Sequence, residues 1–232
     1  MKRLLLLVTL CACLAPAARA QSFCASDGQP MPVALVERFI SADCPTCWSE
    51  PPALQVNTQA VIIDWIVPSP RGDEAPLSAA ASRDALTRLA QLKQAVPAKT
   101  LVTNSPLASA RTLPLRVAHG LAFNDYLGTS IEMKPAKTAT AGPWTAWLLM
   151  LEAIPAGTEG SPMERRLARN LLKTEWTRPL AKDKDQPARF MESRPLSIPA
   201  GANPDNLSVL GWVEDTQGRI RSIALSRCTP AQ

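Results

Sequence analysis

Two cysteines, Cys44 and Cys47 in the stretch FISADCPTCWSEPP, are the residues whose type and spacing could do chemistry. They follow an apolar run typical of a β-strand. A strand that turns into a helix exposes the first thiol at the helix N-terminus, where free N–H groups and the helix dipole stabilise a thiolate. We therefore predict Cys44 as an exposed nucleophile and Cys47 as the thiol that resolves a mixed disulfide. A static structural disulfide and a metal clip are the other interpretations of this spacing.

Two neighbouring features weaken this interpretation. Asp43 places a negative charge next to Cys44, which would raise the pKa of its thiol. Pro51 and Pro52 are tolerated only in a first helical turn, so the helix could begin near Ser49. A redox centre and a vestigial disulfide both stay open.

The first twenty residues, MKRLLLLVTLCACLAPAARA, predict a cleaved secretory signal (1–20) and a periplasmic or secreted protein. The apolar run is too short to span a membrane. Ala18-Arg19-Ala20 is a cleavage pattern that places the mature start at Gln21. A lipid anchor at Cys13 is the alternative. No transmembrane segment is predicted after cleavage.

The charge of the exported chain is close to balanced. Removing the signal removes Lys2, Arg3 and Arg19 from 25 basic residues and leaves 22 against 20 acidic ones. The remaining basic residues are scattered along the sequence, whereas nucleic-acid binders concentrate them on one face. No nucleic acid is therefore predicted as a partner.

Four cysteines remain after cleavage: Cys24, Cys44, Cys47 and Cys228. In an oxidising compartment an even number indicates disulfides, and three pairings are possible. We favour Cys44–Cys47 with Cys24–Cys228, because cysteines so close together at a turn can meet. The second bond would then be structural and would join the two ends of the mature chain. Closing so long a loop stabilises by about 5 kcal/mol in the chain-entropy treatment.

Metal and cofactor chemistry find little support in the sequence. A zinc site needs four ligands and His119 is the only histidine, which we interpret as a packed or surface strand residue. No metal site and no cofactor are predicted. Two thiolates could hold Cu(I), with Met31 or Met133 nearby, and this is a minor alternative.

The elements that must position the cysteines alternate in the first half of the chain. Strands are expected over 31–40, 60–67 and 98–103, with a helix within 77–96. This order predicts an α/β layer with parallel strands at its centre. The second half has short apolar runs and a hairpin, 207–214 and 219–226 around Gly218. The run MERRLARNLLKTEW fits either helix or strand.

The stretch VALVERFISADCPTC resembles the thioredoxin superfamily, and more narrowly a proteobacterial family of exported thioredoxin-like proteins of unknown function. The later runs GPWTAWLLMLEAI and VLGWVEDTQGRIRSIALSRC are similar to that family's β-rich second half. The resemblance implies a thioredoxin-like α/β N-terminal half (21–106) and an antiparallel β-rich C-terminal half (107–232) that packs on the first or completes it. By analogy it also implies a redox role.

The superfamily pattern implies roles for two more residues. Pro97 stands where a cis proline would present the backbone of Val96 to a substrate, and the alternative is an ordinary trans proline. Glu37 would be the buried acid that receives a proton from Cys47, and the alternative is a surface residue paired with Arg38.

The sequence thus predicts an exported thiol–disulfide oxidoreductase that acts through Cys44 and Cys47 on cysteine-containing exported proteins. The alternative is a binding or structural module with both disulfides permanent. Trp144 and Trp147 are expected in the core, with a peptide groove as the alternative.

Overall fold

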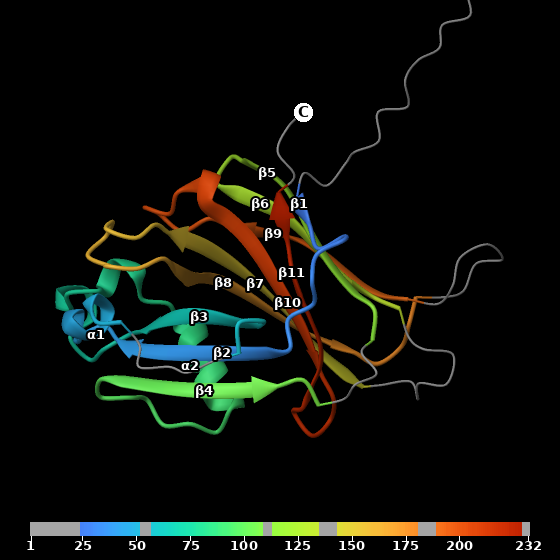
Figure 1. The fold of residues 1–232 in the computed structure, drawn as a ribbon, viewed down its shortest axis with the longest axis horizontal. Coiled ribbons are helices and arrows are strands. Elements are labelled where there is room, and N and C mark those ends of the chain that lie inside the picture. The colour runs from blue at the N-terminus through green and yellow to red at the C-terminus, as the bar shows by residue number, and fades with distance from the viewer. Residues whose placement is uncertain (1–23, 52–56, 109–112, 135–142, 181–188, 229–232) are drawn as a thin grey trace, which may run out of the picture.

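The computed structural model describes residues 24–51, 57–108, 113–134, 143–180 and 189–228 (Figure 1). The predicted signal peptide lies outside the described residues. Within the described part, no helix is long and apolar enough to span a membrane. The strands are β1 (Cys24–Ala25), β2 (Ala34–Ser41), β3 (Ala60–Val67), β4 (Thr100–Pro106), β5 (Leu115–Phe123), β6 (Tyr126–Met133), β7 (Trp144–Ile154), β8 (Arg165–Trp176), β9 (Phe190–Ser197), β10 (Leu207–Glu214), β11 (Ile220–Leu225) and β12 (Arg227–Cys228). The helices are α1 (Pro45–Ser49) and α2 (Arg83–Gln91), with 3-10 turns η1 (Gly72–Glu74), η2 (Ser78–Ala80) and η3 (Pro204–Asn206).

The described strands form two sheets. The larger has seven strands in the order β11-β10-β7-β8-β3-β2-β4, and the smaller has five in the order β12-β1-β5-β6-β9. β2 pairs with β3 in parallel, as expected, and β3 meets β8 in parallel at a single pair, Asp64 and Leu167. The other strand pairs are antiparallel.

The predicted α/β class, with a thioredoxin-like N-terminal half, is wrong. The described chain is mostly β, and its only two α-helices are short. The ambiguous run 163–176 contains strand β8, which joins β3 and brings β7, β10 and β11 into the sheet of β2 and β3. The first half therefore makes no separate α/β layer. Both parts of the chain contribute strands to one sheet. The domain boundary at residue 106 stays a prediction.

The alternation of side chains along β7 explains how this sheet is covered on both faces. Trp147, Leu149 and Leu151 join a core under α2 that includes Trp65 and Trp212. Their neighbours Leu148 and Met150 join a second core between the two sheets. Because successive side chains of a strand point to opposite faces, a strand buried on both sides has a continuous apolar run.

The two sheets approach closely at Gly211 of β10. A Cβ atom there would lie 2.9 Å from Ile131 Cδ1 and closer still to Val117 Cγ1. Real Cβ atoms do not approach other atoms so closely, so this position of β10 requires glycine if β5 and β6 are to pack on it.

Helix α2 begins where a capping residue stands, later than the expected start. The Ser82 hydroxyl accepts a hydrogen bond from the Asp84 N–H at 3.1 Å, which is a typical N-cap. Ala85 and Leu89 then face the core under the sheet. The predicted strand over 60–67 is confirmed, and the predicted terminal hairpin is confirmed as β10 and β11.

Asp215 organises the turn of that hairpin. Its carboxylate accepts hydrogen bonds from the backbone N–H groups of Gln217 and Arg219 and pairs with the Arg219 side chain at 2.8 Å. These contacts outweigh desolvation and hold the pKa of Asp215 below its ordinary value of 3.8. A carboxyl group whose pKa is lower in the folded protein stabilises the fold at pH values above its pKa in the unfolded chain. This stabilisation is lost as the pH falls through its pKa in the folded protein.

Asp215→Asn is therefore expected to lower the free energy of unfolding by about 1 kcal/mol at neutral pH, the size of a charge-assisted hydrogen bond discounted for solvent. The difference from wild type should vanish well below pH 3.8. Urea unfolding at the two pH values measures it. A difference that persists in acid would show that the charge of Asp215 contributes nothing.

Candidate functional site

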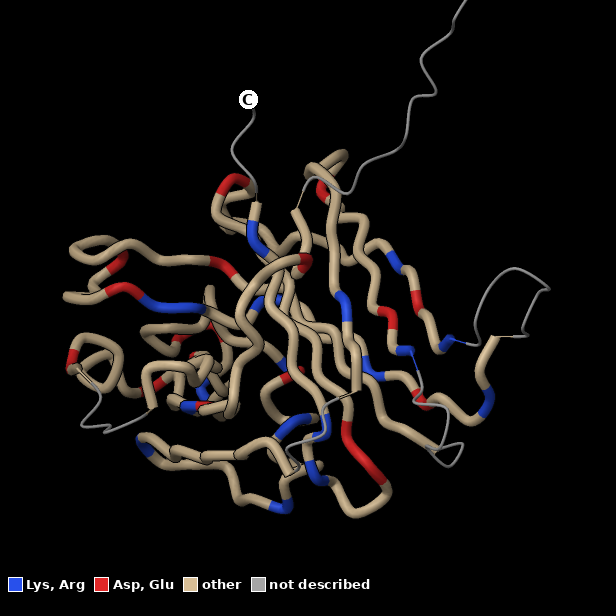
Figure 2. Tube along the Cα trace, turned by 45° about the vertical axis from the view of Figure 1, so that its right-hand side comes forward, with Lys and Arg blue, Asp and Glu red and all other residues tan. Residues whose placement is uncertain are grey.

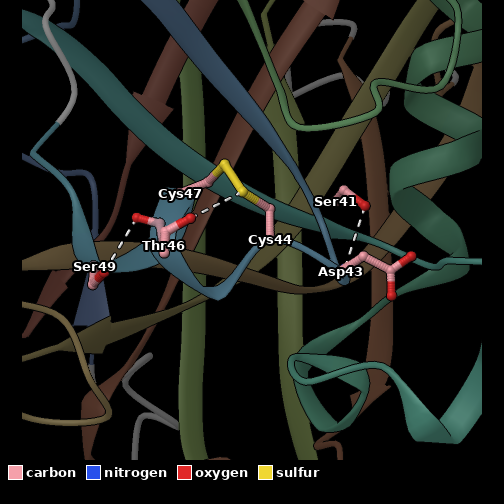
Figure 3. Close-up of a disulfide and its surroundings, with 6 residues drawn as sticks. All are labelled: Ser41, Asp43, Cys44, Thr46, Cys47 and Ser49. Carbon is pink, nitrogen blue, oxygen red and sulfur yellow. Dashed lines mark hydrogen bonds between the residues drawn. A yellow bond between two sulfur atoms is a disulfide. The ribbon is translucent and has the colours of Figure 1, made fainter.

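Cys44 and Cys47 form a disulfide at the end of β2, as predicted. The bond lies in a turn that continues into α1, and the two Cα atoms are 5.3 Å apart (Figure 3). Pro45 occupies the first helical position, where its missing N–H costs nothing. The helix has only five residues and ends at Ser49, with Glu50 as its C-cap directly before Pro51. So short a helix has little dipole with which to stabilise a thiolate at Cys44.

The exposure of the two cysteines is the reverse of the expected order. Cys44 has 8% of its surface exposed, whereas Cys47 is half-buried and Thr46 is exposed. The prediction of an exposed Cys44 is therefore wrong. Cys47 nevertheless packs against a small core under α1 that includes Ala42, Trp48 and Ile154.

Of the two polar side chains next to Cys44 in the turn, one lies at its sulfur and the other faces away. The Thr46 hydroxyl lies 3.5 Å from Cys44 Sγ, within hydrogen-bond reach for sulfur (Figure 3). The carboxylate of Asp43 points away from the disulfide in Figure 3, and it lies 3.6 Å from Arg71 Nη1. The charge of Asp43 therefore faces a guanidinium rather than the sulfur.

Arg165 of β8 binds the C-terminal end of α1. Its Nη2 donates to the carbonyls of Trp48 at 2.6 Å and Glu50 at 2.9 Å, and its guanidinium lies 4.8 Å from the centre of the Trp48 ring. Trp48 also donates from Nε1 to the Glu159 carbonyl at 2.7 Å. These contacts satisfy carbonyls at the end of the helix that have no intrahelical partner.

Arg165 also connects the cysteine turn to a buried carboxylate. Its Nη1 lies 3.5 Å from Asp64 Oδ2, and Asp64 Oδ1 accepts from Arg38 Nε at 2.6 Å. Burial raises the pKa of Asp64, and Arg38 offsets part of that effect. Arg165 was not predicted as part of the site. In the sequence it lies between Glu164 and Arg166, and such a charged stretch does not identify its partner.

Glu37 lies in the core, and its hydrogen bonds among the described residues do not involve the cysteine pair. Its carboxylate forms a two-pronged ion pair with Arg88 of α2 and accepts from Trp65 Nε1 at 3.1 Å. Arg88 Nη1 also donates to Glu214 at 2.7 Å. Of the two positions considered for Glu37, the structure shows the buried one, but the carboxylate faces a guanidinium, so nothing supports proton transfer from Cys47.

Pro97 lies in the loop before β4, half-buried. The first residue of β4, Thr100, pairs with Ile40, and the Ser41 N–H donates to the Lys99 carbonyl at 2.8 Å. The loop thus comes to the same end of β2 as the cysteine turn. No hydrogen bond among the described residues joins Pro97 to Cys44, and its role as a substrate-positioning proline stays a prediction.

The other cysteines, tryptophans and methionines considered in the sequence lie away from the cysteine turn in their contacts or serve the cores. Cys24 and Cys228 form the second disulfide, which confirms the favoured pairing. Trp144 and Trp147 are buried in the two cores. Met133 is buried on β6, and Met31 lies exposed before β2, so no Cu(I) site with Cys44 and Cys47 is indicated by their placement.

Charged residues of both signs alternate along the described chain. Figure 2 shows Lys and Arg segments interspersed with Asp and Glu segments over most elements. Several of the arginines are buried in ion pairs, among them Arg88 and Arg169, so they present no charge to a partner.

Comparisons with known proteins do not identify a family. No protein-family model matches the chain, and no curated protein matches it. Among solved structures, HBP35 of Porphyromonas gingivalis is similar with a TM-score of 0.47 and 13% identity, over 86% of this chain and 75% of that chain. So distant a likeness carries no argument about fold or function. Membership of the exported thioredoxin-like family stays a prediction.

Proposed function

We propose that this protein exchanges disulfides with cysteine-containing exported proteins through Cys44 and Cys47. The observation that carries the proposal is the disulfide at the end of β2, with its half-buried Cys47 beside the exposed Pro45 and Thr46. A bond between residues so close in sequence can open and close without rearranging the sheets, because it constrains only one turn.

In this proposal the attacked sulfur is that of Cys47, because Cys47 is the more exposed of the two cysteines. A thiolate of the partner forms a bond to Cys47 Sγ, the Cys44–Cys47 bond breaks, and Cys44 leaves as a thiolate. The Thr46 hydroxyl, 3.5 Å from Cys44 Sγ, can donate to that thiolate and lower the energy of the leaving group. A second thiolate of the partner then attacks the partner's sulfur that is bonded to Cys47 in the mixed disulfide. The partner leaves with a disulfide of its own, and Cys47 leaves as a thiolate that takes up a proton. The reverse sequence reduces a partner disulfide.

Single-cysteine variants test which sulfur reacts. In Cys44→Ser, the remaining Cys47 thiol is expected to form a mixed disulfide with a small aromatic disulfide reagent. Over the same time, the Cys44 thiol that remains in Cys47→Ser is expected to react little. Mass spectrometry of the intact protein measures both. The two variants are matched controls, since each removes one thiol from the same turn. Equal rates, or a faster Cys47→Ser, would contradict the assignment to Cys47.

A second experiment tests exchange itself. When the oxidised protein is mixed with a reduced dithiol peptide, Cys44–Cys47 is expected to open and the peptide to be oxidised, while Cys24–Cys228 persists. Differential alkylation followed by peptide mapping distinguishes the two bonds. If both bonds resist the peptide, the alternative holds.

That alternative is a binding or structural module with permanent disulfides. The burial of Cys44 and the contacts of Arg165 with α1 favour it, because they hold the turn rigid.

A further inference from the structure

Three potential metal ligands lie in a row across the small sheet. Cys24 of β1 is the direct partner of Cys228 on β12 and of His119 on β5. Directly opposed residues of neighbouring strands point to the same face of a sheet. The two sulfurs and a ring nitrogen of His119 accordingly lie within 4.8 Å of one another.

The ring of His119 is oriented as a ligand would be. Its Nδ1 lies 2.9 Å from the Gly120 carbonyl oxygen. A carbonyl can only accept, so Nδ1 carries the proton and Nε2 carries a lone pair. Metal-binding histidines are commonly held in this way by a backbone carbonyl.

Nε2 itself is buried and has no hydrogen-bond partner among the described residues. The residue as a whole is 4% exposed. A buried polar atom without a partner is uncommon and calls for an explanation.

Space for an ion and a further ligand adjoins the row. A cavity of about 410 Å³ is lined by all three residues and by Asp205, among others. Cys24 is buried, whereas Cys228 is exposed, so the site can be reached from solvent at one end.

We propose that reduction of Cys24–Cys228 converts this row into a Zn²⁺ site whose ligands are the two sulfurs and His119 Nε2. Two thiolates and one imidazole are a known donor set for zinc with an open fourth position. Water or Asp205 completes the tetrahedron. This site is separate from Cys44 and Cys47, and it does not depend on the exchange function proposed above.

The reaction has two steps. One thiolate of a dithiol donor attacks the Cys24–Cys228 bond, forms a mixed disulfide with one cysteine and releases the other. The second thiolate of the donor then breaks the mixed disulfide, the donor leaves as its own disulfide, and both cysteines become thiols. Zn²⁺ then forms two Zn–S bonds and one Zn–N bond and displaces two protons. In the oxidised protein neither sulfur is a thiolate, so the same three residues bind no zinc.

The test uses the full chain with the other four cysteines replaced (C11S, C13S, C44S and C47S), so that only Cys24 and Cys228 can be reduced. The protein is reduced with a phosphine, the reductant is removed, and Zn²⁺ is added in a calorimeter. We expect one Zn²⁺ per reduced chain and two protons released, with no such binding by the oxidised chain. With Co²⁺ as a spectroscopic probe, thiolate-to-metal charge-transfer bands are expected in the near ultraviolet.

His119→Ala should weaken zinc binding by the reduced protein at least about tenfold, since even outer-shell changes cost that much. Thr129→Val is the matched control. Thr129 is the buried cross-strand partner of His119, and the Thr129 hydroxyl donates to the Arg194 carbonyl. Its replacement removes no ligand. Its zinc affinity should match that of the unaltered protein.

Three results would overturn the proposal: equal zinc binding by oxidised and reduced protein, no effect of His119→Ala, or no binding by a reduced chain that keeps its near-ultraviolet circular dichroism. Near-ultraviolet spectra of the oxidised variants show whether each substitution preserves the fold. If the reduced chain unfolds, zinc must restore that spectrum, and failure to do so also overturns the proposal.

Discussion

Arg88→Met is expected to lower the free energy of unfolding by about 3–5 kcal/mol, because it leaves two buried carboxylates without their counter-ion. Arg88 is 1% exposed and donates to both Glu37 and Glu214. Desolvation alone would lower the pKa of Arg88, but these two ion pairs more than offset it and raise the pKa. The guanidinium also lies 5.0 Å from the ring centres of Trp147 and Trp212, which stack on each other.

Urea unfolding at neutral pH measures this effect, and Arg83→Met is its matched control. Arg83 opens the same helix but is exposed, so its replacement should change stability by less than about 0.5 kcal/mol. The triple variant E37Q/R88M/E214Q, which removes all three charges, should recover part of the loss. An Arg88→Met protein as stable as wild type would show that the carboxylates find other partners.

Loss of the Cys24–Cys228 bond is the second large effect. Its two cysteines are 204 residues apart, and opening a loop of that length should cost about 5 kcal/mol in the chain-entropy treatment. The variant C24S/C228S is therefore expected to unfold at markedly lower urea concentration than wild type. Unfolding monitored by tryptophan fluorescence measures it, since buried tryptophans lie in both cores.

The matched control is C44S/C47S, which removes a disulfide that spans three positions. The same treatment gives about 2 kcal/mol for so short a loop. If the two double variants are equally stable, the long bond does not act by constraining the unfolded chain.

Local features of the fold followed from the sequence because they depend on nearby residues. The β-branched run 60–67 between polar and proline-rich segments predicts β3 at its observed bounds. Gly218, at a φ of 72°, marks the turn between β10 and β11. The disulfide pairing followed from the nearness of two cysteines and the even count of the rest.

The fold class did not follow, because it depends on which strands pair over long distances. Leu167, Leu171 and Leu172 have a spacing that suits a helix, yet they lie on β8. A short apolar run does not reveal whether it will join β3 or a separate sheet. The single parallel pair between Asp64 and Leu167 decides that question here.

The candidate site was predicted in type but not in environment. The sequence identifies Cys44 and Cys47, but the core of Trp48, Ile154 and Leu167 against which Cys47 packs comes together only in the folded protein. In the same way, the sequence left Glu37 either buried or on the surface, because its partner Arg88 comes from a helix 51 residues further on.

The antiparallel contact between β1 and β12 has a practical consequence for protein engineering. Because Cys24 and Cys228 are direct partners on adjacent strands, both ends of the described chain lie at one place on the molecule. Circular permutation is favoured when termini lie this close together. A chain rejoined there by a short linker and opened at the exposed Asn124–Asp125 turn should keep every strand pairing described above.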